Sequence, residues 1–222
     1  MLNAILQGQS MISLILTAFS ILVMIFVIFP LHESAHALVA LWLGDDTADR
    51  QGRISLNPFS HLDPLGTLGM VLFGIGWAKP VPVNTARCRK VKSQKTAMAL
   101  TAAAGPLANI LSALVFMIIQ KIILVTVAPS DARSYVTLAL YFIIDIDIFN
   151  GVFNLLPVPP FDGSRILLAF LPTKYYFGIM KYEQYIMIAL LVLMWTGYLS
   201  IPFQILSNWV YNLLDLMTGF IV

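Results

Sequence analysis

The sequence predicts an all-α polytopic membrane protein with about four to five transmembrane helices and a short re-entrant hairpin or strand segment. Its 222 residues are 59% hydrophobic and only 11% charged, whereas an ordinary soluble domain is roughly 25% charged. The mean hydropathy of +0.85 implies more apolar surface than one soluble core of this size can bury, so we expect much of it to face lipid. Long uncharged runs then place the individual helices.

The first uncharged run, Met11 to Phe29, has 19 residues, close to the roughly 20 that a transmembrane helix needs. It continues as apolar sequence to Gly44. Because no Lys or Arg precedes it and no small-residue cleavage site follows it, we expect it to stay in the mature protein and not to act as a cleaved signal peptide. Three further uncharged runs bring the predicted number of spans to four, or to five if the last run crosses twice. These runs are Thr96 to Gln120, Ser134 to Ile144 with its continuation to Phe161, and Gln184 to Leu214, which Pro202 interrupts.

Between the first two runs lie a glycine-rich segment and a basic loop. The segment from Pro64 to Ala78 is apolar but short and contains four glycines, so we expect a re-entrant hairpin or a pair of strands there. From Lys79 to Lys95 there are six basic residues and no acidic one, which places this loop in the cytoplasm by the positive-inside rule. We therefore expect a multi-pass protein of the cell membrane.

The composition also restricts the organisation of the chain and its partners. No repeat with a period of 20 to 50 residues is evident, so we expect residues 1–222 to form a single domain. Cys88 is the only cysteine, which excludes a disulfide within the chain. The formal net charge of +2 is too small to indicate a nucleic-acid partner. The lipid bilayer is the expected environment, and the oligomeric state is left open.

A metal-binding pattern, H-E-x-x-H, lies within the first apolar run and reads His32-Glu33-Ser34-Ala35-His36. On a helix the two histidines share one face and can bind one Zn²⁺, while Glu33 can act as a base on the attacking water. His32 precedes Gly44 by 12 residues, or roughly 18 Å of helix, so we expect the motif well inside the membrane and reached from the cytoplasmic side. The alternative is a pair of histidines hydrogen-bonded between packed helices, although polar clusters without a function are costly at such depth.

A third metal ligand is available at Asp162, where Asp162-Gly163 follows a run containing three prolines. The prolines break the helix and present Asp162 from irregular backbone, which is tolerated at membrane depth only when it is packed in protein or lines a wet cavity. Two histidines, one carboxylate and an open position form the ligand set of a catalytic zinc, with one ion per chain. Taken alone, Asp162-Gly163 would indicate an ordinary turn.

These motifs resemble the site-2 protease family of intramembrane zinc metalloproteases, peptidase family M50. The resemblance runs in order from about Pro30 to Arg165 and is closest to the short, compact members without PDZ or CBS domains. It implies cleavage of a substrate's transmembrane segment, zinc ligands at His32, His36 and Asp162, and a catalytic base at Glu33. Besides H-E-x-x-H, the matching blocks are Gly52-Arg53-Ile54-Ser55-Leu56-Asn57-Pro58-Phe59-Ser60-His61-Leu62-Asp63-Pro64-Leu65-Gly66-Thr67, Gly76-Trp77-Ala78-Lys79-Pro80-Val81-Pro82-Val83-Asn84, Ala104-Gly105-Pro106-Leu107-Ala108-Asn109 and Asn154-Leu155-Leu156-Pro157-Val158-Pro159-Pro160-Phe161-Asp162-Gly163.

Further polar residues are candidates for supporting roles. Asn154 is expected to steady the oxyanion or the substrate backbone, with capping of the broken helix as the alternative. Asp147, Asn150 and Asn154 fall at i, i+3 and i+7, a polar stripe that we interpret as a water or proton path. His61 is the only histidine outside the motif, and both a helper role near the site and a turn-stabilising role are open. The glycine-rich segment is expected to hold an unwound substrate by β-addition.

Two other classes of function remain possible from the sequence. A membrane protein that binds or transports metal ions would also use intramembrane His and Asp ligands, but it predicts several sites along a path and internal repeats. A catalytically silent scaffold that binds transmembrane helices would have no use for Glu33. We therefore predict an enzyme whose partners are a transmembrane protein substrate and the bilayer.

Overall fold

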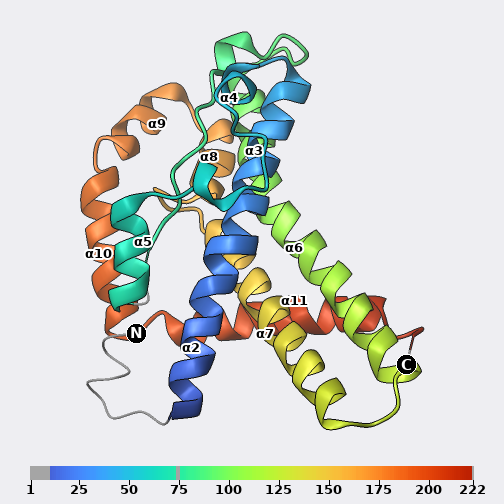
Figure 1. Ribbon diagram of the computed structural model, residues 1–222. Coiled ribbons are helices and arrows are strands. Elements are labelled where there is room, and N and C mark those ends of the chain that lie inside the picture. Colours follow the sequence, from blue (N-terminus) through green and yellow to red (C-terminus); the bar gives the residue numbers. More distant parts are fainter. Residues whose placement is uncertain (1–10, 74–75, 222) are drawn as a thin grey trace.

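The computed structural model describes residues 11–73 and 76–221, and within them it contains helices and one isolated antiparallel bridge, between Leu62 and Ala78 (Figure 1). The predicted all-α class is confirmed. Three helical runs in this part of the chain are long and apolar enough to cross a membrane: 14–43, 94–126 and 131–154.

The first run is a single rod made of α2 (Met11–Val23), a π-helical turn η1 (Met24–Ile28) and α3 (Phe29–Leu43). Pro30 has no N–H, and its ring would collide with the carbonyl four residues earlier in a regular α-helix. The wider π-helical turn lies at this point and accommodates the proline. The rod ends at Gly44, whose φ of 112° is left-handed, as is common after the last turn of a helix.

The other two long helices are α6 (Gln94–Thr126) and α7 (Asp131–Asn154). α6 packs against α3 and also against α7 (Figure 1). Its buried face is rich in small residues, which let helix backbones approach closely in a membrane. These buried residues include Ala97, Ala102, Ala104, Gly105 and Ala113.

The C-terminal run differs from the prediction of one or two spans. It is divided into α10 (Glu183–Trp195) and α11 (Ser200–Met217), and neither belongs to a candidate span, so the described residues hold three such runs instead of four to five. The break lies at Gly197, with a φ of 78°, and not at Pro202. Pro202 falls in the first turn of α11, where its missing N–H has no helical partner to lose.

The glycine-rich segment was expected to form either a re-entrant hairpin or a pair of strands. Of these alternatives the pair of strands is wrong for Pro64–Phe73, which form a helix, α5. The chain then returns in extended form, with Lys79 N–H donating to the His61 carbonyl over 2.7 Å. A Cβ at Gly66 would overlap the carbonyl of Trp77, so this glycine permits α5 to contact the returning backbone.

Short elements complete the fold around these helices. α8 and α9 follow the proline-rich break after α7 and lead into α10 (Figure 1). The helices α6, α7 and α11 enclose the largest apolar cluster, which includes Met117, Ile148 and Phe203. The bounds of the remaining elements are Thr47–Arg50 for α4, Pro58–Ser60 for η2, Thr85–Arg87 for η3, Asp162–Phe170 for α8 and Thr173–Met180 for α9.

Candidate metal centre

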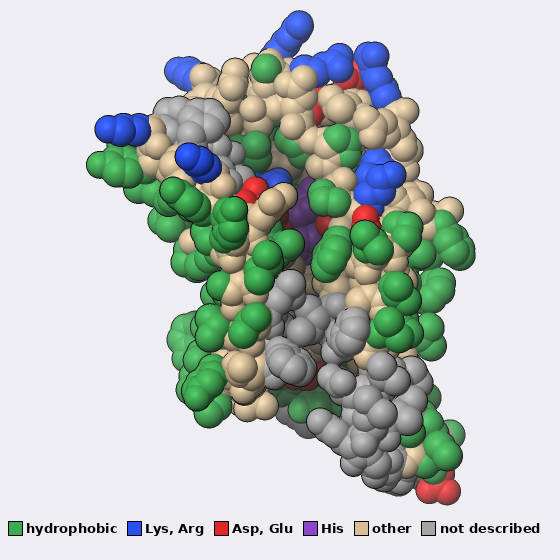
Figure 2. All heavy atoms as spheres, turned by 90° about the vertical axis from the view of Figure 1, so that its left-hand side faces the viewer, with side chains coloured by type: hydrophobic (Ala, Val, Ile, Leu, Met, Phe, Trp, Pro, Cys, Tyr) green, Lys and Arg blue, Asp and Glu red, His purple; other side chains and the backbone are tan. Residues whose placement is uncertain are grey.

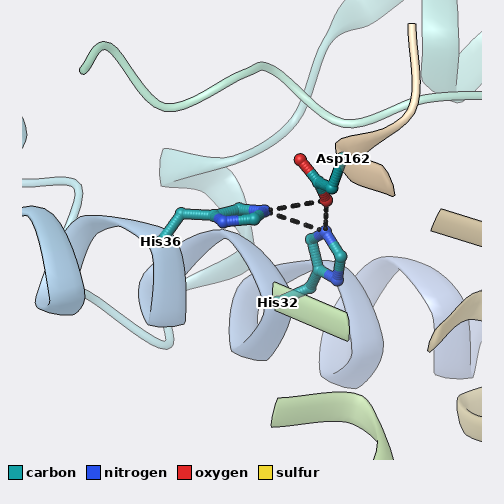
Figure 3. A group of neighbouring side chains, drawn as sticks. All are labelled: His32, His36 and Asp162. Atoms are coloured by element: carbon teal, nitrogen blue, oxygen red, sulfur yellow. Dashed lines mark hydrogen bonds and ion pairs between the residues drawn. The ribbon is translucent and has the colours of Figure 1, made fainter. Parts of the chain in front are cut away.

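Two helices bring the three predicted metal ligands together. His32 and His36 lie one turn apart on α3, and Asp162 is the first residue of α8 (Figure 3). The two Nε2 atoms are 3.0 Å apart, and Asp162 Oδ2 lies 3.1 Å from His32 Nε2 and 3.2 Å from His36 Nε2. Both histidines are buried. All three ligand atoms therefore face a common point.

This geometry fits a tetrahedral zinc ion. With zinc–nitrogen bonds of about 2.0 Å, neighbouring ligand atoms of a tetrahedron are about 3.3 Å apart, close to the three separations observed. A side chain from α6 would destroy this space, because a Cβ at Gly105 would overlap Nε2 of both His32 and His36. The missing side chain of Gly105 thus leaves room for an ion. Donors of this type, two imidazoles and one carboxylate, are also those of a catalytic zinc site.

Each histidine is held through its other ring nitrogen. His36 Nδ1 lies 2.7 Å from the backbone carbonyl of Thr101, and because a carbonyl only accepts, Nδ1 must carry the proton. Nε2 of His36 then presents a lone pair to the site, as a metal ligand requires. His32 Nδ1 lies 2.5 Å from Asn109 Oδ1. Both partners are on α6, so this helix orients both rings.

Glu33 lies beside the cluster and next to an extended segment of the chain that runs from Ala78 to Asn84. Its Oε2 accepts a hydrogen bond of 3.1 Å from the Val81 backbone N–H. The buried guanidinium of Arg53 holds the same segment by donating to the carbonyls of Lys79 and Pro80. Arg53 thus fixes the segment that contacts the predicted base.

The cluster opens into a cavity of about 200 Å³. Histidine side chains are visible at the bottom of a recess between hydrophobic flanks of the molecule (Figure 2). The cavity walls come from α3, α6, the extended segment, the region where α7 breaks and α8 begins, and the start of α10. Among the lining residues are His32, Glu33, Val81, Val83, Asn154 and Asp162.

The structure places the other predicted residues at different distances from this cavity. Asn154 lines it, and its amide nitrogen donates to the Asn150 carbonyl over 3.0 Å. Asp147 is fully buried and accepts a hydrogen bond from Asn109. Because Asn109 also contacts His32, Asp147 is linked to the cluster through Asn109. His61 is 1% exposed, and its Nε2 contacts the Ser55 carbonyl at 2.7 Å. Burial lowers the pKa of His61, which keeps its ring neutral at pH 7.

Gly105, Asn109 and Arg53 stand within the matching blocks named above, and the sequence alone indicated no individual role for any of them. Gly105 and Asn109 are four residues apart on α6, so they share one face of that helix. That spacing is visible in the sequence. What the sequence does not show is that this face meets the H-E-x-x-H turn of α3, because many faces of neighbouring helices could do so.

The fold and this cluster define a class: a helical membrane protein with a metallopeptidase-type His-His-Asp site and an adjacent glutamate. Residues 120–196 match peptidase family M50, a stretch that includes Asp162 but not the two histidines. The chain is 37% identical over 175 residues to the Bacillus subtilis (strain 168) protein named "Putative zinc metalloprotease YwhC", covering 78% of each chain. It is 27% identical over 187 residues to "Putative zinc metalloprotease Rip2" of Mycolicibacterium smegmatis, covering 82% of this chain and 69% of that protein. No solved structure matches the chain. The chain belongs to peptidase family M50, the site-2 protease family.

Proposed function

We propose that this protein is an intramembrane zinc metalloprotease that hydrolyses peptide bonds within or near the transmembrane segments of membrane-protein substrates. The observation that carries this proposal is the convergence of His32, His36 and Asp162 with Glu33 beside them. The histidines and Glu33 lie on a helical run long and apolar enough to span a membrane. Relatives named as zinc metalloproteases support the same chemistry.

His32, His36 and Asp162 would hold one zinc ion through Nε2, Nε2 and Oδ2. When bound, the ion supplies a Lewis acid that polarises the scissile carbonyl and lowers the pKa of water. The carboxylate of Glu33 accepts the proton from the attacking water and passes it to the leaving amine. The Val81 N–H that donates to Oε2 of Glu33 keeps this carboxylate beside the cavity.

The substrate must be extended to react, because a peptide bond inside an intact helix is shielded. The segment from Ala78 to Asn84 is itself extended and lines the cavity at Pro80, Val81 and Val83, so it is suited to pair with an unwound substrate by β-addition. The sequence led us to expect substrate pairing along the glycine-rich segment, but the first part of that segment is the helix α5. The segment from Ala78 to Asn84 is therefore proposed as the pairing element instead. Asn154 also lines the cavity and is proposed to steady the oxyanion or the substrate backbone.

A single metal cluster favours hydrolysis over metal transport. Within residues 11–73 and 76–221, one group of three His, Cys, Asp or Glu side chains could hold an ion, whereas a transport path would need successive sites. The basic loop between α5 and α6 supports a cell-membrane protein whose site is reached from the cytoplasmic side.

The test is cleavage of a panel of transmembrane peptides by detergent-purified protein, with zinc content measured in parallel. Glu33→Gln should retain zinc and lose at least a hundredfold in cleavage rate, since general acid–base catalysis contributes about 10² to 10⁴. His36→Ala should lose both zinc and cleavage. Equal cleavage by wild type and Glu33→Gln would contradict the proposed base. Zinc uptake into proteoliposomes, without cleavage of any peptide, would favour transport instead.

A further inference from the structure

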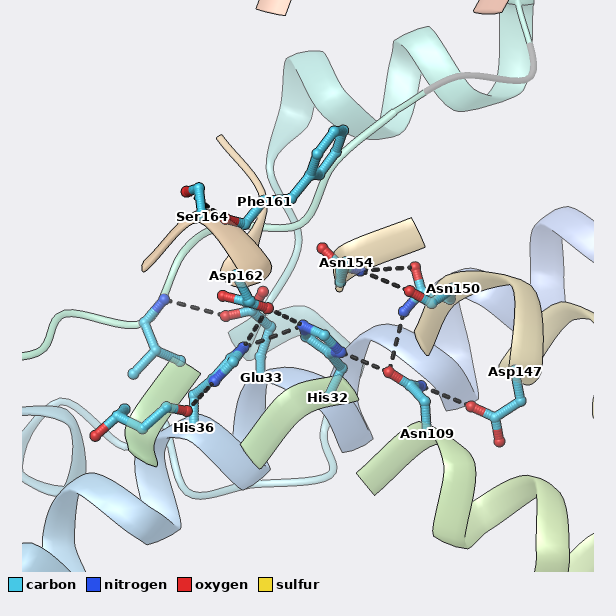
Figure 4. Close-up of polar contacts among 12 residues, drawn as sticks. His32, Glu33, His36, Asn109, Asp147, Asn150, Asn154, Phe161, Asp162 and Ser164 are labelled. Atoms are coloured by element: carbon cyan, nitrogen blue, oxygen red, sulfur yellow. Dashed lines mark hydrogen bonds and ion pairs between the residues drawn. The ribbon is translucent and has the colours of Figure 1, made fainter. Parts of the chain in front are cut away.

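We propose that Asn109 and Asp147 are positioning residues that fix the tautomer of His32, leaving its Nε2 free to bind the metal. The inference rests on the proposed function, because it concerns the same metal centre. The three side chains form a chain of hydrogen bonds that runs from α7 through α6 to α3 (Figure 4).

The chain of contacts is short and buried. Asn109 Nδ2 donates to Asp147 Oδ1 over 2.6 Å, and Asn109 Oδ1 lies 2.5 Å from His32 Nδ1. Asn109 and Asp147 are fully buried, and His32 is 5% exposed. Water therefore cannot readily substitute for any of these partners, so the direction of each hydrogen bond is set by the side chains themselves.

The direction follows from the chemistry of the groups. The amide nitrogen of Asn109 must find an acceptor, and the Asp147 carboxylate offers one. The amide oxygen then faces His32, and Asn150 Nδ2 donates to this same oxygen over 3.2 Å. An amide oxygen only accepts, so His32 Nδ1 must carry the proton. The neutral ring then has its lone pair on Nε2, the atom that faces Asp162 and His36.

His32 differs from His36 in this respect. The partner of His36 is the Thr101 backbone carbonyl, which can present only an acceptor to the ring. The partner of His32 is a side-chain amide, which can rotate by 180° and present N–H to the ring. In that orientation the His32 proton would move to Nε2 and the ring would no longer be a ligand. Asp147 prevents this rotation, so a carboxylate that touches neither metal nor substrate controls the ligand set.

The decisive measurement is the zinc dissociation constant, determined by chelator competition on the purified full-length protein. Asn109→Leu and Asp147→Leu should weaken zinc binding about 10- to 100-fold, the usual effect of removing the partner of a metal-binding histidine. Asp147→Asn can still offer an oxygen to Asn109, so its affinity should stay within about threefold of wild type. Asp145→Leu removes an exposed carboxylate from the same helix and should leave the affinity unchanged.

A second measurement reports the tautomer directly. The chain has three histidines, so a ¹⁵N spectrum of the imidazoles in the zinc-loaded protein is simple to assign, with His61→Gln identifying one ring. We expect a protonated Nδ1 and a metal-bound Nε2 for His32. This measurement needs neither leucine variant, so it holds even where a leucine variant fails to fold.

The outcomes separate this inference from the proposed function. Wild-type affinity in folded Asn109→Leu and Asp147→Leu would overturn it, as would zinc bound through Nδ1 of His32. Equal loss in Asp147→Asn and Asp147→Leu would show that charge acts instead of orientation, and would also overturn it. Peptide cleavage by wild type would leave the proposed function standing in all three cases. Absence of zinc from wild type would overturn both.

Discussion

Gly105 acts at the metal centre through the absence of a side chain. The residue lies on the face of α6 that meets the two histidine rings, and a Cβ there would overlap their Nε2 atoms. Membrane helices commonly use small residues for close packing, and α6 has many of them. At this position the missing side chain leaves space beside the two histidine rings, where a metal ion would bind.

Replacing Gly105 by Ala should therefore remove zinc while leaving the fold helical. We expect the zinc content of the purified variant to fall below about a tenth of wild type, because the added methyl group occupies the space of the ligand atoms. The matched control is Gly178→Ala in α9, where a Cβ would meet nothing within 4 Å. Full zinc occupancy in Gly105→Ala would contradict the geometry of the site.

At the scale of elements, the extended segment after α5 contributes backbone donors to the cavity. Prolines at 80 and 82 have no N–H, so only Val81 and Val83 offer donors in the part that lines the cavity. Val81 donates to Glu33. The N–H of Val83 makes no hydrogen bond to any residue that the structure describes. It is therefore available to a substrate strand.

Val83→Pro should reduce cleavage without affecting zinc content. One backbone hydrogen bond contributes about 0.5 to 1.5 kcal/mol, so we expect kcat/KM to fall about two- to tenfold. Val83→Ala is the matched control, because it shortens the same side chain and keeps the N–H. If alanine and proline reduce cleavage equally, the side chain and not the backbone makes the contact.

At the scale of the whole molecule, charge and hydrophobicity are separated along the long helices. Lys and Arg gather at one end, and hydrophobic side chains cover the flanks below them (Figure 2). The long helix α6 also exposes apolar side chains, among them Leu107, Leu111 and Val115. The arrangement matches a protein whose basic end lies at the cytoplasmic surface.

Cysteine labelling tests this orientation. A membrane-impermeant maleimide should reach Lys92→Cys only from the cytoplasmic side and Ala128→Cys only from the opposite side of intact vesicles. The native Cys88 is buried, and burial raises the pKa of its thiol, so the reactive thiolate is scarce at pH 7 and its background labelling should be low, rising as the pH increases. Labelling of both positions from one side would overturn the assignment of α6, the helix between them, as a membrane span.

The sequence by itself determined the helical membrane class, the positions of three long helices and the identity of a metal-binding motif. These features depend on local physics: apolar runs of sufficient length, the i and i+4 spacing of two histidines, and prolines that end a helix between Asn154 and Asp162. Each needs only neighbouring residues, so each can be read without knowing what packs against it.

The tertiary structure decided the rest. α5 (Pro64–Phe73) is a helix that contacts backbone returning from farther along the chain, and Gly66 permits this contact. The C-terminal run divides at Gly197, and not at the more conspicuous Pro202. Asn109, Gly105 and Arg53 have their places at the site only because α6 and the extended segment meet α3. Such contacts join residues tens of positions apart, and no local pattern specifies which faces meet.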